Sequence, residues 1–263
     1  MGQDQAGTGK GDALMKTFIF ALCLMGWAGL VSANVAGPAL LESHASLDSK
    51  NNLQRGARTF VNYCLSCHSA SYMRYSRLAD DLGLTKEAVA QNLMFTTDKI
   101  GNPMQVAMKP ADAEQWFGVP PPDLSVIARA RGADWLYSFL MGFYQDEKRP
   151  TGSNNLYFPT TAMPAVLSRL QGIQVLKPAA EGDAAHDGGH GGHAGPTLEL
   201  AMAGTMSPEE YATTVRDLVS FMVYLGEPAK LVRYRIGFWV IAFLFVLFIA
   251  TYLLKKEYWK DVH

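Results

Sequence analysis

The chain has 263 residues, of which 49% are hydrophobic and only 18% are charged, against about 25% charged residues in typical soluble domains. This composition excludes a mainly disordered chain, which requires low hydrophobicity and high charge. Three cysteines are too few for a disulfide scaffold, and a net charge of −1 gives no electrostatic case for binding nucleic acid. The apolar excess indicates membrane segments or a large buried cofactor.

The first apolar run has the pattern of a secretory signal peptide. Lys16 precedes an uncharged stretch from Thr17 to Val31, and Val31-Ser32-Ala33 places small residues at both recognition positions of a cleavage site. We therefore expect residues 1–33 to be a leader and the following domain to be exported. The alternative is an uncleaved N-terminal anchor.

A second apolar run lies near the C-terminus. Ile236 to Leu254 contains 19 residues and no charge, so as a helix it spans roughly 28 Å, close to the hydrocarbon thickness of a bilayer. The sequence predicts a transmembrane helix over residues 235–254, although a buried core helix is the alternative. With the leader, this places the domain of residues 34–234 in the periplasm of a single-pass protein of the bacterial inner membrane, and residues 255–263 in a cytoplasmic tail.

The exported part is acidic. Residues 34–229 contain 20 Asp and Glu residues against 15 Lys and Arg residues. An acidic surface can steer a basic mobile partner toward a docking site. Solubility alone explains the count equally well.

Three helices are expected in the exported domain, and their signals differ in strength. Apolar residues recur on one helical face over about residues 49–63, and another helix is plausible at 133–144. The last helix starts at Ser207-Pro208-Glu209-Glu210, which supplies an N-cap, a first-turn proline and a capping-box glutamate, and it stops at Gly226-Glu227-Pro228. No segment shows sustained strand alternation. Loops this long need something else, such as a large cofactor, to organise them.

Residues 179–195 form a low-complexity stretch rich in glycine that includes His186, His190 and His193. Histidines at spacings of four and three could bind a transition metal. So many glycines do not hold a helix, however, so the spacing fixes no geometry. We expect a flexible insertion on the surface.

The motif that carries chemistry is Cys64-Leu65-Ser66-Cys67-His68. The pattern C-x-x-C-H is typical of c-type haem attachment, in which two thiols form thioethers with the vinyl groups and the histidine becomes an axial ligand of the iron. A thioredoxin-like site needs a βαβ setting, which the sequence pattern does not show. A zinc site needs a second pair of Cys or His ligands, and no cysteine follows Cys67. The sequence therefore predicts one covalent haem c, and with Cys23 in the leader no cysteine is left for a disulfide.

The second axial ligand decides between an electron carrier and an open iron that binds small molecules. Methionines on the expected helices are more often core residues than ligands. Met104, Met108 and Met163 lie in loops beside proline or glycine, where a ligand loop can be rigid. Position favours Met163, which comes late in the domain but before its last helix, and leaves Met104 and Met108 open.

The chain resembles the cytochrome c1 family, the haem c subunits of quinol–cytochrome c reductase (bc1) complexes, over nearly all of its mature length. The resemblance rests on several segments besides the haem motif. They are Arg55-Gly56, Pro121-Pro122-Asp123-Leu124-Ser125, Arg129-Ala130-Arg131, Tyr157-Phe158, Ala162-Met163-Pro164 and the anchor after Gly226-Glu227-Pro228.

The resemblance also implies roles for residues outside the haem motif. It implies that Met163 is the axial methionine, that Arg131 pairs with a haem propionate, and that Pro121 and Pro122 pack on the haem. Trp135 falls where relatives place an aromatic residue, often tyrosine, near the haem. Some bacterial relatives brace the methionine loop with a disulfide, which this chain cannot form.

The implied fold is a mainly α, class I cytochrome c-like haem domain with long loops, followed by one transmembrane helix. The implied function is a subunit that takes electrons from a Rieske iron–sulfur protein and passes them through a His/Met-ligated haem c to cytochrome c. It would lie beside cytochrome b in a dimeric complex in the bilayer; the complex would be the enzyme, and this chain would use no acid–base or nucleophilic residue. Two alternatives remain, a stand-alone anchored electron shuttle and a haem sensor or peroxidase with an open iron.

Overall fold

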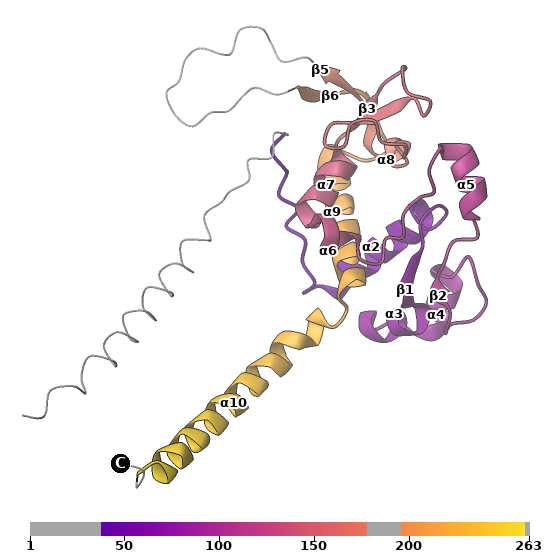
Figure 1. The fold of residues 1–263 in the computed structure, drawn as a ribbon. Helices are drawn as coiled ribbons and strands as arrows, with labels where there is room; N and C mark the ends of the chain where they lie inside the picture. The colour runs from indigo at the N-terminus through magenta and orange to yellow at the C-terminus, as the bar shows by residue number, and fades with distance from the viewer. Residues whose placement is uncertain (1–37, 178–195, 261–263) are drawn as a thin grey trace, which may run out of the picture. The chain divides into compact units, whose positions relative to one another are not determined.

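The computed structural model describes residues 38–177 and 196–260, and Figure 1 shows its elements. The expected leader (1–33) and the histidine-rich insertion (179–195) lie outside these residues. Helices and long loops make up most of the described chain, so the expected mainly α class is confirmed.

Residues 38–177 and 196–260 form helices and six short strands. The helices are α2 (Lys50–Tyr63), α3 (Tyr75–Leu82), α4 (Lys86–Asn92), α5 (Pro110–Phe117), α6 (Ile127–Arg131), α7 (Ala133–Met141), α8 (Ser168–Gln171), α9 (Pro208–Gly226) and α10 (Lys230–Tyr258). The strands pair antiparallel as β1 (Ala70–Arg74) with β2 (Pro103–Met104), β3 (Phe143–Gln145) with β4 (Ser153–Asn155), and β5 (Gly172–Lys177) with β6 (Thr197–Ala203).

Each of the two best-marked helices begins at a serine N-cap, which was predicted from the sequence for α9 but not for α2. The Ser49 side chain accepts a hydrogen bond from the Asn52 backbone N–H at the start of α2. At the start of α9, Ser207 and Glu210 form the reciprocal bonds of a capping box. The expected helices over 49–63 and from Ser207 to Gly226 are therefore confirmed.

Helices α2 and α9 cross at Gly56 and form the centre of the core. A Cβ atom at Gly56 would overlap the carbonyl oxygen of Asp217 and lie 2.7 Å from the Cβ of Phe221. The Phe60 and Phe221 rings pack with centroids 5.5 Å apart, and the Arg55 Nε donates to the Asp217 carboxylate at 2.7 Å. Only glycine permits this close approach of the two backbones.

Helix α7 is shorter than the expected 133–144. It ends at Met141, and after Gly142 the chain continues as β3. A Cβ atom at Gly142 would lie 2.6 Å from the Tyr157 ring, so this glycine lets the ring pack against the backbone at the end of the helix.

The three two-stranded sheets in the described part of the chain were not expected from the sequence. Most of the strands are too short to show an alternation of apolar and polar residues. Strand β6 does show one, since Leu198, Leu200 and Met202 alternate along Thr197–Ala203. That signal predicts a strand, and reading the region as loop alone was wrong.

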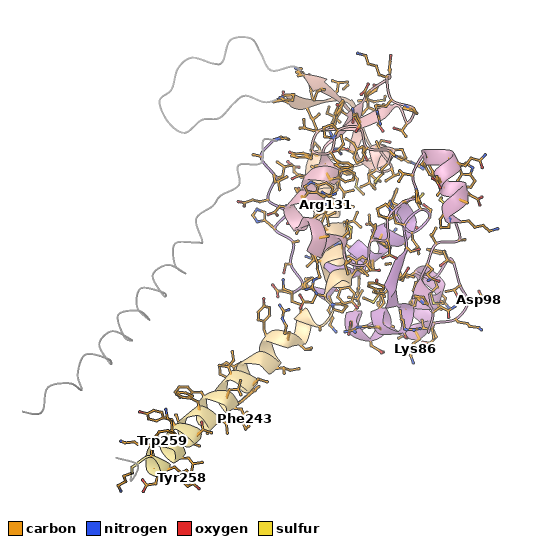
Figure 2. The ribbon with its side chains drawn as sticks, in the orientation of Figure 1. Lys86, Asp98, Arg131, Phe243, Tyr258 and Trp259 are labelled. Atoms are coloured by element: carbon orange, nitrogen blue, oxygen red, sulfur yellow. The ribbon has the colours of Figure 1, made fainter. Side chains whose placement is uncertain are left out.

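Helix α10 is longer than the expected span of 235–254 and fits a single-pass membrane anchor. Its segment Val232–Tyr258 is long and apolar enough to cross a bilayer, and none of its most apolar part is buried against the rest of the described chain. Figure 2 labels Phe243 along this helix and Tyr258 and Trp259 near its end. These aromatic side chains at the end suit a membrane–water interface.

Candidate haem site

The C-x-x-C-H motif follows directly from the end of α2. The Cys64 N–H donates to the Phe60 carbonyl oxygen at 2.8 Å and completes the last turn of the helix. The N–H groups of Cys67 and His68 then donate to the Cys64 carbonyl oxygen at 3.0 and 2.8 Å. This tight turn brings both thiols and the imidazole to one side of the chain.

These residues line a cavity of about 360 Å³ with a largely apolar wall. Leu136, Phe139 and Leu140 of α7 form part of the wall, and Leu218 and Met222 of α9 form another part. A cavity of this size and polarity suits a large, flat, apolar cofactor.

All eight site residues expected from the sequence line this single cavity. They are Cys64, Cys67, His68, Pro121, Pro122, Arg131, Trp135 and Met163. The lining contains two methionines, Met163 in a loop and Met222 on α9, and it contains neither Met104 nor Met108. Met104 is instead fully buried in β2.

The His68 ring is held in the tautomer that a metal ligand requires. Its Nδ1 lies 2.8 Å from the Pro122 carbonyl oxygen, which can only accept, so the proton sits on Nδ1 and Nε2 keeps a free lone pair. Burial lowers the pKa of His68 and outweighs the hydrogen bond to Pro122 and the charge of Asp123, which both raise it. The imidazole is therefore neutral at neutral pH.

Cys64 lacks the character of a redox thiolate. Burial, with a smaller contribution from Cys67, raises the pKa of the Cys64 thiol to about 12, whereas redox cysteines have lowered pKa values. Residues 38–177 and 196–260 also contain no group of three or more His, Cys, Asp and Glu side chains able to hold a metal ion. Thioether attachment fits these two thiols better than redox exchange or zinc binding.

The proline segment is fixed to the chain just after the haem motif. The Asp123 carboxylate accepts hydrogen bonds from the N–H groups of Ser71 at 3.0 Å and Ser125 at 2.8 Å. The Leu124 N–H donates to the Ser69 carbonyl oxygen at 2.8 Å. These bonds hold Pro122 where its carbonyl oxygen reaches His68.

Arg131 places a cation at the solvent edge of the cavity. Its guanidinium lies 4.9 Å from the centroid of the Trp135 ring and 5.8 Å from that of Phe158, and Figure 2 labels it at the end of α6. Trp135 in turn stacks on Phe139 at 5.1 Å. The aromatic faces orient a planar cation that can pair with a carboxylate of a bound cofactor.

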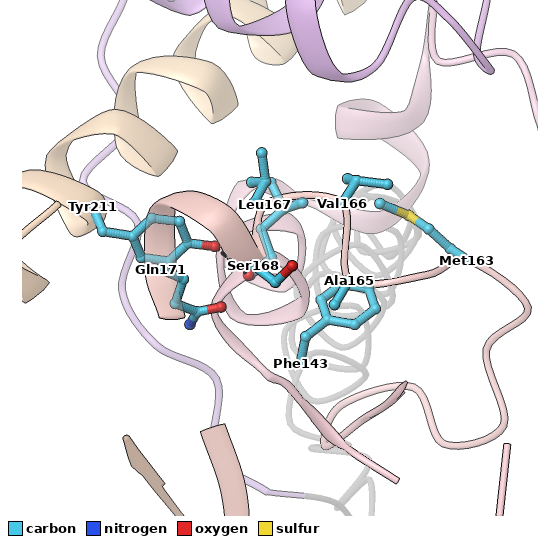
Figure 3. Close-up of a pocket in the computed structure, with 9 residues that line it drawn as sticks. Phe143, Met163, Ala165, Val166, Leu167, Ser168, Gln171 and Tyr211 are labelled. Carbon is cyan, nitrogen blue, oxygen red and sulfur yellow. Dashed lines mark hydrogen bonds between the residues drawn. The ribbon is translucent and has the colours of Figure 1, made fainter. Parts of the chain in front are cut away.

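The chain beyond Met163 lies beside Leu140 of α7 and Tyr211 of α9, with which it lines a small hollow. Figure 3 shows the segment from Met163 to Gln171 beside Phe143 and Tyr211. The Tyr211 hydroxyl donates to the Leu140 carbonyl oxygen at 3.0 Å. This bond joins α9 to α7 beside the segment. The methionine loop therefore rests on the same two helices that form the cavity wall.

The residues present fit a covalent haem. Two thiols and a neutral imidazole lie on one segment, a thioether sulfur lies on another, and a cation stands at the edge of an apolar cavity. Leu218 and Met222 were not singled out from the sequence as lining residues. Their spacing of four on the last helix, which places them on one face, was the available signal.

Comparisons with known proteins agree with this site. Residues 42–174 match the model of the Cytochrome C1 family, a segment that includes the haem motif and Met163. The chain is 47% identical to cytochrome c1 of Allochromatium vinosum, over 95% of this chain and 100% of the relative. It is 28% identical to cytochrome c1 of Blastochloris viridis, over 81% and 82% of the two chains.

A differently named relative is equally similar. The chain is 48% identical to a Nitrosomonas europaea protein named ammonia monooxygenase gamma subunit, over 88% of this chain and 93% of the relative. The family match and the full-length similarity together decide the family. The chain belongs to the cytochrome c1 family, whose members carry one covalent haem c.

Proposed function

We propose that this chain is the haem c subunit of a respiratory bc1 complex that takes electrons from a Rieske iron–sulfur protein and passes them to cytochrome c. Membership of the cytochrome c1 family supports an electron-transfer haem subunit. The observation that carries the proposal is that Met163 and His68, from segments far apart in sequence, line the same cavity as the two thiols. A His/Met-ligated haem is typical of an electron carrier with a raised potential.

The chain's own residues bind and orient the cofactor. Cys64 and Cys67 would attach it, while His68, held through Pro122, and Met163 would be the axial ligands. When bound, haem c supplies one-electron chemistry at its iron. The apolar wall excludes water and Arg131 offers a cation to a propionate, so the protein sets the potential and needs no acid–base residue.

The proposed setting is the inner membrane of a bacterium. The exposed apolar surface of α10 supports a bilayer around this helix. Membership of the cytochrome c1 family supports a cytochrome b subunit beside it. The leader-like N-terminus supports a haem domain in the periplasm and a cytoplasmic C-terminus. Family membership supports assembly into a bc1 complex, which we propose to be dimeric.

The substitution Met163→Leu tests the ligand. We expect covalent haem to be retained, the reduction potential to fall and the reduced protein to bind carbon monoxide, because the iron loses its sulfur ligand. Met222→Leu is the matched control, since Met222 lines the same cavity from α9. An unchanged potential and no carbon monoxide binding in Met163→Leu would contradict the assignment.

Detergent extraction of the native membrane tests the assembly. Purification of this chain together with b-type haem, an iron–sulfur protein and quinol oxidation would support the bc1 proposal. Recovery of the chain alone would support an anchored shuttle. Recovery with the other subunits of an ammonia monooxygenase would assign the chain to the assembly for which its N. europaea relative is named.

A further inference from the structure

The loop that carries Met163 has no cysteine to brace it, yet it is fixed on both sides by side chains of β4. Ser153, Asn154 and Asn155 are consecutive, and they are only 6%, 8% and 0% exposed. Polar groups buried to this degree are costly unless each is hydrogen-bonded. These three side chains form hydrogen bonds to the loop of residues 157–165, which carries Met163, and to the elements beside it.

The Asn155 carboxamide joins the loop to helix α7. Its Nδ2 donates to the Phe139 carbonyl oxygen at 2.7 Å. Its Oδ1 accepts from the N–H groups of Tyr157 at 2.9 Å and Phe158 at 3.1 Å. One side chain thus ties the start of the loop to a helix that forms the wall of the haem cavity.

The Asn154 carboxamide holds the middle of the loop. Its Oδ1 accepts from the Thr160 N–H at 2.8 Å, and its Nδ2 donates to the Asp146 carboxylate at 3.0 Å. Thr160 has a φ of +65°, in the left-handed region that a β-branched residue rarely adopts. A guanidinium N–H of Arg149 donates to the Thr160 carbonyl oxygen at 2.9 Å, so this strained residue is held from both of its peptide groups.

The other side of Met163 is held from the same strand. The Ser153 hydroxyl oxygen accepts from the Ala165 N–H at 3.1 Å. The loop is therefore bonded before and after the methionine, at Phe158, Thr160 and Ala165, by three neighbouring side chains. These bonds leave the Met163 side chain directed at the cavity that it lines.

We propose that Asn154 and Asn155 are positioning residues for the axial methionine, and that their carboxamides do in this chain what a covalent brace would do. The proposal rests on the ligation by Met163 proposed above. A neutral thioether stays on a haem iron only while its loop stays closed. The free energy of local opening of the loop, which these bonds raise, therefore decides how long the ligand remains bound.

The test compares the loss of the methionine ligand with global unfolding in the full-length holoprotein. Asn155→Asp keeps the shape of the side chain and its acceptor toward Tyr157 and Phe158, but it replaces the donor that faces the Phe139 carbonyl oxygen. Ligation is followed by the far-red sulfur-to-iron charge-transfer absorption of the ferric protein, and unfolding by far-ultraviolet circular dichroism, both against temperature.

We expect the absorption of Asn155→Asp to disappear at a lower temperature than the helical signal, with a wider gap between the two transitions than in the wild type. Carbon monoxide binding to the reduced variant should be several-fold faster. Tyr224→Phe is the matched control: it removes the hydrogen bond, 2.8 Å long, from the hydroxyl of the buried Tyr224 to the Asp81 carboxylate, and Tyr224 does not line the cavity. The control should lower both transitions together.

The proposal is overturned if Asn155→Asp loses the absorption only when it unfolds, as in Tyr224→Phe. Asn154→Ala tests the other carboxamide in the same way. If the temperature difference between loss of the absorption and unfolding is no wider in that variant than in the wild type, the result counts equally against the proposal. The variant Met163→Leu distinguishes a failure of the positioning proposal from a failure of the proposed ligation by Met163. If that variant keeps the absorption, Met163 is not the ligand and both proposals fall; if it loses the absorption while the asparagine variants behave like the control, only the positioning role falls.

Discussion

At the scale of single residues, Arg131 is the charged group whose placement bears most directly on the potential of the haem. Its guanidinium rests against Trp135 and Phe158 at the edge of the cavity. A positive charge there favours the ferrous state, because the ferrous haem carries one positive charge fewer than the ferric haem. Trp135 holds this cation by its ring face, which a tyrosine ring could also do.

Arg131→Gln should therefore lower the reduction potential, as measured by redox titration of the holoprotein. Arg131→Lys keeps the charge but loses the bidentate fork, so its potential should fall less. Arg129→Gln is the matched control, because Arg129 lies on the same helix and does not line the cavity. Equal shifts in Arg131→Gln and Arg129→Gln would mean that only the overall charge of the domain matters.

Gly56 is the residue on which the approach of α2 to α9 depends. Gly56→Ala would insert a methyl group against the Asp217 carbonyl oxygen and Phe221, and overpacking of this kind costs about 3 kcal/mol of stability. Thermal unfolding of the variant should show this loss. Gly101→Ala, at a position with open space around it, should change stability by less than about 0.5 kcal/mol. A Gly56→Ala variant as stable as the wild type would mean that the helices separate easily.

At the scale of elements, the segment before α2 is bonded across the two helices that form the cavity wall. The Leu41 N–H donates to the Ser138 hydroxyl oxygen on α7 at 2.8 Å. The Ser46 N–H donates to the Ser220 hydroxyl oxygen on α9 at 3.2 Å. Between them, the Ser43 N–H donates to the Asp134 carboxylate at 2.8 Å. The hydrogen bonds from the Ser43 backbone and side chain, with a smaller contribution from His44, lower the pKa of Asp134.

Because the pKa of the Asp134 carboxyl is lowered, the stability of this segment depends on pH, and the direction of the dependence follows from the shift. The contribution of the carboxylate to stability is present above the ordinary pKa of 3.8 and is lost as the pH falls through the lower folded-state value. Hydrogen-exchange protection at Ser43, corrected for intrinsic rates, should therefore fall below about pH 3.8. In Asp134→Asn the protection should be weaker at pH 7 and change little with pH. The same acid dependence in both proteins would show that another group is responsible.

Elements with strong local signals were predictable, and those stabilised by distant contacts were not. The apolar face of residues 49–63 and the capping box at Ser207 marked two helices, whereas α3 to α6 and α8 have four to eight residues each, too few for a local pattern to show. The eight predicted site residues came from the haem motif and the family resemblance, and the helical lining residues such as Leu218 and Met222 were missed. The role of Asn154 and Asn155 depends on bonds to α7 and to a loop of irregular structure, which nothing in the adjacent sequence indicates.

At the scale of the whole molecule, the haem domain and the anchor differ in where their apolar side chains lie. The buried hydrophobic residues of the described chain all precede Gly226, and α10 exposes its apolar side chains instead. Removing residues 230–263 should therefore release a soluble protein that retains covalent haem and its spectrum, as membrane fractionation would show. When membranes are washed at alkaline pH and sedimented, the full-length chain should stay in the membrane pellet. A truncated chain that remains in the membrane would mean that a second segment anchors it.

The join between α9 and α10 consists of only three residues, 227–229. Successive Cα atoms are 3.8 Å apart, so Gly226 and Lys230 can be separated by about 15 Å at most. Met222, which lines the haem cavity, lies one helical turn before this join. At any angle between the two helices, the cofactor travels with its anchor and stays close to the lipid. We therefore expect any electron-transfer partner to diffuse to the haem, and lengthening residues 227–229 to change which partners can reach the haem without altering its ligands.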